Sequence, residues 1–288
     1  MASDLWQNGY HAINGIKLFC RDWRPDNETG LPVLALHGSL TQSGMWTETV
    51  ESLGSVRVLC PDQRGYALTK DTGDDACVTF ASDAVALAHA LLPGRYIVMG
   101  HSFAASITLE TALLASEQVA GVVLVDPVVR IGAPPAAPVA NPVSQPESFA
   151  TLEDAARYVR ATEEGVWTDA TSQRFVQDIM MRDGDSGLWR FPYTAERLRR
   201  LRAFQASVAG DYELFAKAKA VRCPVLIFRG GMSKRFAAAA EQPFLDAFDP
   251  SGSPKPECVL CPASGHFPTT TEPGIVVAAL KRFLSGIV

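Results

Sequence analysis

The 288-residue sequence predicts an α/β protein in which helices cover both faces of a mostly parallel central sheet. Short apolar runs, typical of buried strands, alternate with segments of helical spacing through most of the chain. Strand-like runs are missing between about 132 and 220, where amphipathic helices take their place. The second observation predicts a helical block that is inserted into the sheet-forming domain.

The composition argues against several classes of binding partner. A net charge of -5, with no long run of either sign, argues against nucleic acid as a partner. No apolar stretch reaches the ~18 residues that a membrane span requires, and no signal peptide is evident, so we expect a cytoplasmic protein. The C-x-x-C pair at Cys258 and Cys261 has no second pair, so we expect neither a metal nor a cofactor. The sequence carries no signal of oligomeric state.

The first hundred residues alternate strands with helices. Residues 16–23 alternate polar with apolar side chains, as an antiparallel edge strand does. Short apolar runs predict buried strands at 33–36 and 56–60, with a helix that begins near Met45 between them. Apolar side chains at helical spacing predict a further helix over residues 80–92.

A candidate nucleophile follows the next strand. Residues 96–99 are an apolar run, and Gly-His-Ser-Phe-Ala follows at 100–104, before a segment of helical spacing. Small residues two positions before and after a serine permit a very tight strand–turn–helix connection. Such a turn holds the serine in a strained conformation with its hydroxyl exposed. The pattern predicts Ser102 as a nucleophile.

A proline-rich stretch and a block of helices interrupt the sheet. Five prolines lie between 132 and 146, which excludes regular structure there. Residues 151–220 follow as a set of amphipathic helices. We therefore predict a core formed by residues 1–131 and 221–288, with an inserted helical domain at 132–220.

Polar residues follow the strands on both sides of this insertion. Asp126 ends an apolar run at 121–125, and His266 follows the strand predicted at 257–261. Ligands bind outside the carboxyl ends of the strands in such sheets, so residues at these ends should gather at one edge. The residues expected there are His37, Ser39, Ser102, Asp126 and His266.

Six motifs together resemble the α/β-hydrolase superfamily over nearly the whole chain. They are His37-Gly38, Asp62-x-Arg64-Gly65, the turn at Ser102, Asp126-Pro127, Arg229-Gly230-Gly231 and Gly265-His266-Phe267. Their order fits the family's sequence of nucleophile, acid and histidine. The resemblance implies an α/β-hydrolase fold, in which residues 132–220 are the helical cap that roofs the pocket.

The resemblance also implies a role for each group. A hydroxyl is almost never ionised near neutral pH, so Ser102 needs a base, and His266 is the candidate. The oxyanion needs donors that are in place before charge develops, and the backbone N–H groups of Ser39 and Phe103 suit that role.

The acid departs from the family's usual pattern. The family usually carries Asp after its seventh strand, as in R-G-x-x-S-D, but residues 229–234 read R-G-G-M-S-K. Lys234 would repel an imidazolium rather than stabilise it. Asp126 stands at the family's second location, 24 residues (126 − 102) beyond Ser102, and is favoured here. The alternatives are Asp246, Asp249, Glu241 or no acid at all.

These observations predict a serine hydrolase that cleaves a small, largely apolar carboxylic ester or lactone through an acyl-enzyme, without a cofactor. The partner is then a small-molecule substrate. A carbon–carbon bond hydrolase or a cofactor-free oxygenase would use the same residues, and a binding protein could retain the scaffold without catalysis. The side chains expected to line the pocket are His37, Leu40, Trp167, Met180 and Trp189.

Overall fold

The protein is described by a computed structural model that covers residues 5–39, 41–131, 146–207, 213–249, 251 and 254–287. An eight-stranded sheet runs through it in the order β1-β2-β4-β3-β5-β6-β9-β10. Its strands are β1 (Trp6–Ile13), β2 (Ile16–Trp23), β3 (Val33–Leu36), β4 (Val58–Pro61), β5 (Tyr96–His101), β6 (Val119–Val125), β9 (Val225–Gly230) and β10 (Glu257–Cys261).

The sheet is parallel from β4 to β10, which confirms the predicted fold class. β2 pairs antiparallel with both β1 and β4, so residues 16–23 are not the edge strand that their alternation predicted. The outermost strand at this side of the sheet is β1, which the sequence analysis missed. Its side chains are mostly exposed or half-buried, so it carries little apolar signal.

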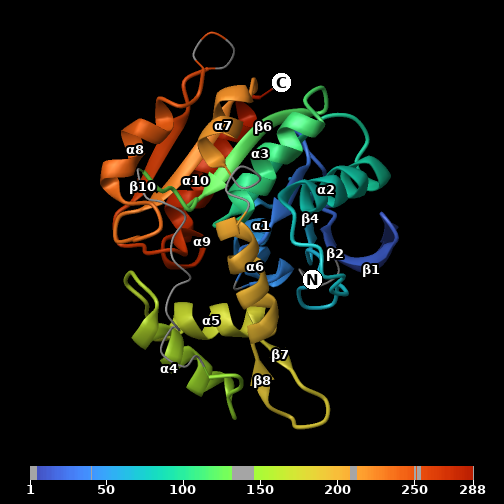
Figure 1. The fold of residues 1–288 in the computed structure, drawn as a ribbon, viewed down its shortest axis with the longest axis vertical. Coiled ribbons are helices and arrows are strands. Elements are labelled where there is room, and N and C mark those ends of the chain that lie inside the picture. Colours follow the sequence, from blue (N-terminus) through green and yellow to red (C-terminus); the bar gives the residue numbers. More distant parts are fainter. Residues whose placement is uncertain are drawn as a thin grey trace.

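Helices cover both faces of the sheet (Figure 1). Neighbouring strand residues point to opposite faces, so Val98 packs in one apolar core while Ile97 and Met99 pack in the other. The first core includes side chains of α2 (Cys77–Leu91), α3 (Ala104–Leu114), α7 (Leu214–Ala220) and α8 (Ala238–Leu245). The second includes side chains of η2 (Ser43–Trp46), α1 (Thr47–Leu53) and α10 (Pro273–Ser285).

The described part of the predicted cap forms a layer at one end of the molecule (Figure 1). It contains α4 (Leu152–Thr162), α5 (Asp169–Ile179), β7 (Met181–Arg182), β8 (Trp189–Arg190) and α6 (Ala195–Ser207). Helix α7 also falls within the predicted range of 132–220, but its buried side chains pack in the first core of the sheet domain. β7 and β8 form a separate antiparallel pair, so the expectation of helices alone was wrong for these residues. None of these elements joins the central sheet. Residues 132–145, most of the proline-rich stretch, lie outside the described residues.

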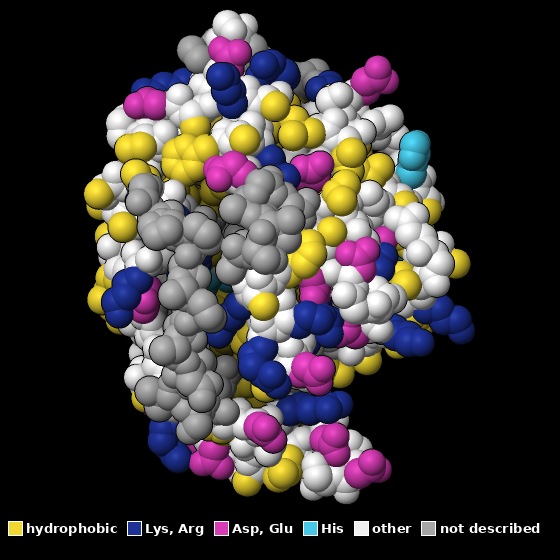
Figure 2. All heavy atoms as spheres, in the orientation of Figure 1, with side chains coloured by type: hydrophobic (Ala, Val, Ile, Leu, Met, Phe, Trp, Pro, Cys, Tyr) yellow, Lys and Arg dark blue, Asp and Glu magenta, His cyan; other side chains and the backbone are white. Residues whose placement is uncertain are grey.

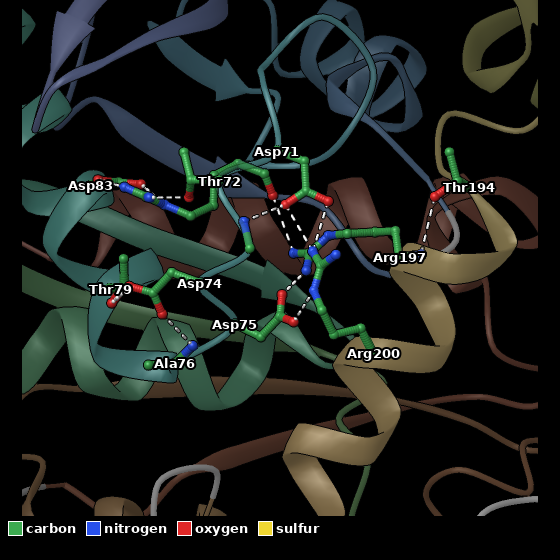
Figure 3. A network of polar contacts seen from close by, with 12 residues as sticks. Asp71, Thr72, Asp74, Asp75, Ala76, Thr79, Asp83, Thr194, Arg197 and Arg200 are labelled. Atoms are coloured by element: carbon green, nitrogen blue, oxygen red, sulfur yellow. Dashed lines mark hydrogen bonds and ion pairs between the residues drawn. The ribbon is translucent and has the colours of Figure 1, made fainter.

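Helix α6 lies against the core domain. Figure 2 shows Lys and Arg side chains on this face of the molecule, and Figure 3 shows Arg197 and Arg200 of α6 in ion pairs with the core. Arg197 is 1% exposed and pairs with the buried Asp75, while Arg200 lies 2.7 Å from carboxylate oxygens of Asp75 and Asp71. Gly65 has φ +79°, and a Cβ built on it would lie 2.5 Å from Arg197 Nε. Charge pairing and a close backbone approach thus join α6 to the loop after β4.

A short helix follows the loop that carries His266. Helix α9 (Pro268–Thr271) starts two residues after His266, and it leads into α10. Among the helices of the described ranges, none combines the length and the apolar character that a membrane span needs.

Candidate active site

Ser102 occupies a sharp turn between β5 and α3. Its φ of +59° lies in the left-handed region, which costs a non-glycine residue free energy. A Cβ built on Gly100 would lie 2.0 Å from Thr108 Oγ1, so only glycine fits two positions before the serine. The turn is held by a hydrogen bond from Ser102 N to Val125 O, at 3.0 Å. It places the serine hydroxyl at the carboxyl end of the sheet.

His266 reaches the serine from the loop after β10. Its Nε2 atom lies 2.7 Å from Ser102 Oγ. A Cβ built on Gly265 would lie 2.2 Å from Glu164 O, so the glycine lets the histidine loop pass directly beneath a cap residue. Burial, together with the positive charge of Arg235, lowers the pKa of His266. The imidazole is therefore neutral near pH 7 and able to accept a proton.

Asp126 follows β6 and holds the other side of the imidazole. Its Oδ2 atom accepts a 2.6 Å hydrogen bond from His266 Nδ1, which leaves Nε2 as the acceptor for the serine hydroxyl. Oδ1 accepts from Gly230 N at 2.9 Å. Burial raises the pKa of Asp126, and the hydrogen bonds from Ser233 and Gly230 oppose that rise.

The alternative acids are engaged elsewhere. Asp246 accepts from Gln242, Asp249 accepts from Ser251, and Glu241 pairs with Arg229. None of the three shares a hydrogen bond with His266 in the described structure.

Ser233 is a site residue that the sequence analysis did not assign. Its hydroxyl donates to Asp126 Oδ2 at 2.6 Å, beside the bond from His266. The adjacent Lys234, at the family's usual acid position, is 85% exposed and pairs with Glu164. The only signal in the sequence was the R-G-x-x-S pattern, which places this serine at the carboxyl end of β9.

The two predicted oxyanion donors lie on either side of the serine. Phe103 directly precedes α3, so its N–H belongs to the helix N-terminus, where amides lack helical acceptors. A Cβ built on Gly38 would lie 3.3 Å from the Cβ of Ser102, which shows how closely the loop of Ser39 approaches Ser102. Neither the Ser39 nor the Phe103 amide donates a hydrogen bond to another described residue.

His37 lies under this loop. It is fully buried, its Nδ1 donates to Gly38 O at 2.8 Å, and its Nε2 accepts from Gln63 N at 3.0 Å. Burial lowers its pKa to about 4. The sequence analysis expected His37 to line the pocket. Instead, both of its ring nitrogens bond to backbone groups, and the side chain supports the loop from beneath.

The other residues expected to line the pocket lie in different parts of the structure. Trp167 packs 6.0 Å from the ring of Phe267, the residue after His266. Met180 is buried in the apolar core under the cap, and Trp189 lies on β8, paired with Phe149. Leu40 lies outside the described residues. Among the expected pocket residues that the structure describes, only Trp167 is linked to the site by a ring contact.

His101 is a second residue without a role in the sequence analysis. It is 1% exposed, and its Nε2 donates to His266 O at 2.7 Å. The two imidazole rings lie 4.7 Å apart. This contact ties the histidine loop to the serine turn. Nothing in the sequence indicated it, because residues 101 and 266 meet only in the folded chain.

Comparisons with known proteins agree with this geometry. The model of the alpha/beta hydrolase family matches residues 33–280. The chain is 25% identical, over 261 residues, to the 2-(acetamidomethylene)succinate hydrolase of Mesorhizobium japonicum, and the match covers 89% of this chain and 88% of that one.

Solved structures resemble the whole chain. An alpha/beta hydrolase from Novosphingobium aromaticivorans is 25% identical, with complete coverage of both chains and a TM-score of 0.75. The thioesterase domain from the curacin biosynthetic pathway has a TM-score of 0.73 at 18% identity, and the match covers 97% of this chain and 99% of that one. The chain belongs to the alpha/beta hydrolase family.

Proposed function

We propose that the protein is a serine hydrolase that cleaves a small carboxylic ester or lactone through an acyl-enzyme on Ser102. The observation that carries this proposal is the continuous chain of hydrogen bonds from Ser102 Oγ through His266 to Asp126, with lengths of 2.7 and 2.6 Å. The relative from Mesorhizobium japonicum is itself named as a hydrolase.

In the first half-reaction, Ser102 Oγ attacks the carbonyl carbon while His266 Nε2 takes the hydroxyl proton. The Ser39 and Phe103 amides stabilise the oxyanion, and Asp126 stabilises the imidazolium. His266 then gives its proton to the departing alkoxide. In the second half-reaction a water molecule, deprotonated by the same imidazole, attacks the acyl carbon. The bond to Ser102 Oγ then breaks, the acid is released, and the imidazolium returns its proton to Ser102 Oγ.

The surroundings of the site favour a substrate that is largely apolar near its carbonyl group. The rings of Phe103 and Phe267 flank the nucleophile and the base in sequence, and both rings are buried. Trp167 extends this apolar surface from the cap side. Ser102 is only 6% exposed, which suits a site closed to bulk water.

A fluorophosphonate probe tests the proposal, because an activated serine attacks its phosphorus, expels fluoride and becomes a stable phosphonate ester. We expect labelling of the wild type at Ser102, hydrolysis of a panel of short esters and lactones, and no labelling of Ser102→Ala. Turnover should fall by roughly 10³-fold or more in that variant, with a residual rate from the oxyanion donors. Retention of more than a tenth of kcat would exclude serine chemistry. Ligand binding without labelling would instead favour a binding protein.

A further inference from the structure

The connector between α4 and α5, residues 163–168, lies directly against the loop after β10 that carries the histidine of the site. Val166 N donates to Ala263 O at 2.8 Å, and Gly165 forms an antiparallel bridge with Ser264. The histidine loop is therefore hydrogen-bonded, through its backbone, to the block that is inserted between β6 and β9.

The backbones at this contact approach more closely than side chains would allow. Gly165 has a φ of +97°, and a Cβ built on it would collide with Gly265 N. A Cβ built on Gly265 would collide with Glu164 O, and one built on Gly230 would collide with Gly265 O. The connector, the histidine loop and the end of β9 are thus packed in layers, with glycine at each contact.

Glu164 links this stack to the loop after β9. Its Oε2 atom accepts a 2.8 Å hydrogen bond from Lys234 N. Lys234 directly follows Ser233, whose hydroxyl donates to Asp126. The carbonyl oxygen of Glu164 accepts from Trp167 Nε1 at 3.0 Å, on the side of the connector that faces the histidine loop. One residue of the connector therefore contacts both loops that meet at the imidazole.

The backbone hydrogen bond between Glu164 and Lys234 matters more than their ion pair. Lys234 Nζ lies 3.7 Å from Glu164 Oε1, and the lysine side chain is 85% exposed, so this pair contributes little. The Glu164 side chain is only 22% exposed, and a hydrogen bond from an amide to a carboxylate is of the stronger, charge-assisted kind. The acceptor oxygen of Glu164 is thus the group that holds the loop.

We infer that Glu164 is a positioning residue for His266 and Asp126. It fixes the spacing between the loop after β9 and the loop after β10, and that spacing sets the hydrogen bond between the carboxylate and the imidazole. Glu164 acts through these loops and not on the reacting atoms. This inference rests on the proposed function and adds to its machinery a residue from the inserted block.

Two variants with side chains of similar length test this role in the hydrolysis of a short ester. Glu164→Met removes the acceptor, whereas Glu164→Gln retains an acceptor oxygen without the charge. We expect kcat to fall by roughly 10-fold or more in Glu164→Met with KM unchanged, because a small misplacement of catalytic groups can cost as much as about 100-fold. Glu164→Gln should retain most of the wild-type kcat. Glu153→Met, at an exposed glutamate of α4, is the matched control and should change neither constant.

Proton NMR gives a second readout that does not require turnover. A proton held between His266 Nδ1 and a carboxylate oxygen 2.6 Å away gives a far-downfield signal, which is assigned by its absence from His266→Gln. We expect this signal in the wild type, Glu164→Gln and Glu153→Met, and its loss through exchange with water in Glu164→Met. Circular dichroism shows whether each variant is folded, and Glu164→Ala, which also lacks the acceptor, takes the place of Glu164→Met if that variant is not.

Three results would overturn the positioning role. They are an unchanged NMR signal in Glu164→Met, equal losses of kcat in Glu164→Met and Glu164→Gln, and an equally large loss in Lys234→Met, which would assign the effect to the ion pair. Failure of the proposed function gives a different result. A wild type that hydrolyses no ester and is not labelled at Ser102 would reject the hydrolase, while loss of the NMR signal in Glu164→Met would still support the positioning role.

Discussion

At the scale of single residues, the bond between Asp126 and His266 fixes the tautomer of the imidazole. In Asp126→Asn, the amide NH₂ would face Nδ1 and favour the tautomer whose Nε2 carries a proton. Such an imidazole cannot accept the proton of Ser102, so we expect kcat to fall by roughly 10²–10⁴-fold with little change in KM. Steady-state kinetics with a short ester measure this. Asp246→Asn is the control, since that side chain only accepts from Gln242. A loss below threefold in Asp126→Asn would assign the acid elsewhere.

Ser233 controls how easily the same carboxylate is ionised. Its hydrogen bond lowers the pKa of Asp126, against the rise caused by burial. In Ser233→Ala the pKa of Asp126 therefore rises, and because the ionised form supports catalysis, the acid limb of kcat/KM moves to higher pH. We expect a shift of roughly one pH unit.

Ser233 also has a structural role, because its Oγ accepts hydrogen bonds from the amides of Arg235 and Phe236. The pH profile of kcat/KM separates the two roles. Loss of those bonds alone would lower the rate evenly at every pH. Ser233→Thr retains the hydroxyl, so the acid limb of its kcat/KM profile should lie at the same pH as in the wild type. An unshifted limb in Ser233→Ala would show that Asp126 does not titrate in this range.

At the scale of secondary-structure elements, α6 depends on a buried ion pair for its position on the core. Arg197→Gln would remove one of the two arginines that pair with the buried Asp75 and leave the ion pair with Arg200. Removing one partner of a buried pair is strongly destabilising, so we expect the free energy of unfolding to fall by roughly 3 kcal/mol. Chemical denaturation monitored by circular dichroism measures the change. Arg199→Gln, on the exposed side of α6, should stay within about 0.5 kcal/mol of the wild type.

At the scale of the whole molecule, buried histidines make stability depend on pH. Burial lowers the pKa of His37 to about 4 and that of His101 to about 3, below their values in the unfolded chain. The unfolded chain therefore binds more protons below pH ~6.5, and stability falls as the pH drops from there toward 4. Each histidine should remove roughly 2 kcal/mol between pH 7 and pH 5, while the raised pKa of Asp126 offsets part of this loss.

Denaturant unfolding at the two pH values tests this expectation. His101→Asn should flatten the dependence, because the group that takes up a proton on unfolding is gone. His89→Gln should leave it unchanged, since that side chain is exposed. A stability that is equal at pH 7 and pH 5 in the wild type would contradict the assignment of neutral buried rings.

The sequence predicted the features that local patterns encode. Buried parallel strands appear as apolar runs, and the residues that follow them meet at one edge, so Ser102, Asp126 and His266 could be named in advance. Ser233 and His101 could not, because their contacts depend on how loops distant in sequence approach each other. β1 was missed for the opposite reason: an exposed edge strand has no continuous apolar run. The ion pairs between α6 and the core could not be predicted from the sequence either, since arginines on a helix are typical of a solvent-exposed face.

The loop after β9 also has a practical consequence for directed evolution. The Met232 side chain is 50% exposed and that of Lys234 is 85% exposed, while Ser233 between them is buried against the acid. Because the carboxylate that bonds the imidazole belongs to Asp126, directly after β6, neither exposed position carries a hydrogen bond to the imidazole. A library randomised at 232 and 234, with 233 held constant, would sample new chemistry at the rim of the site and leave the proton-transfer machinery intact.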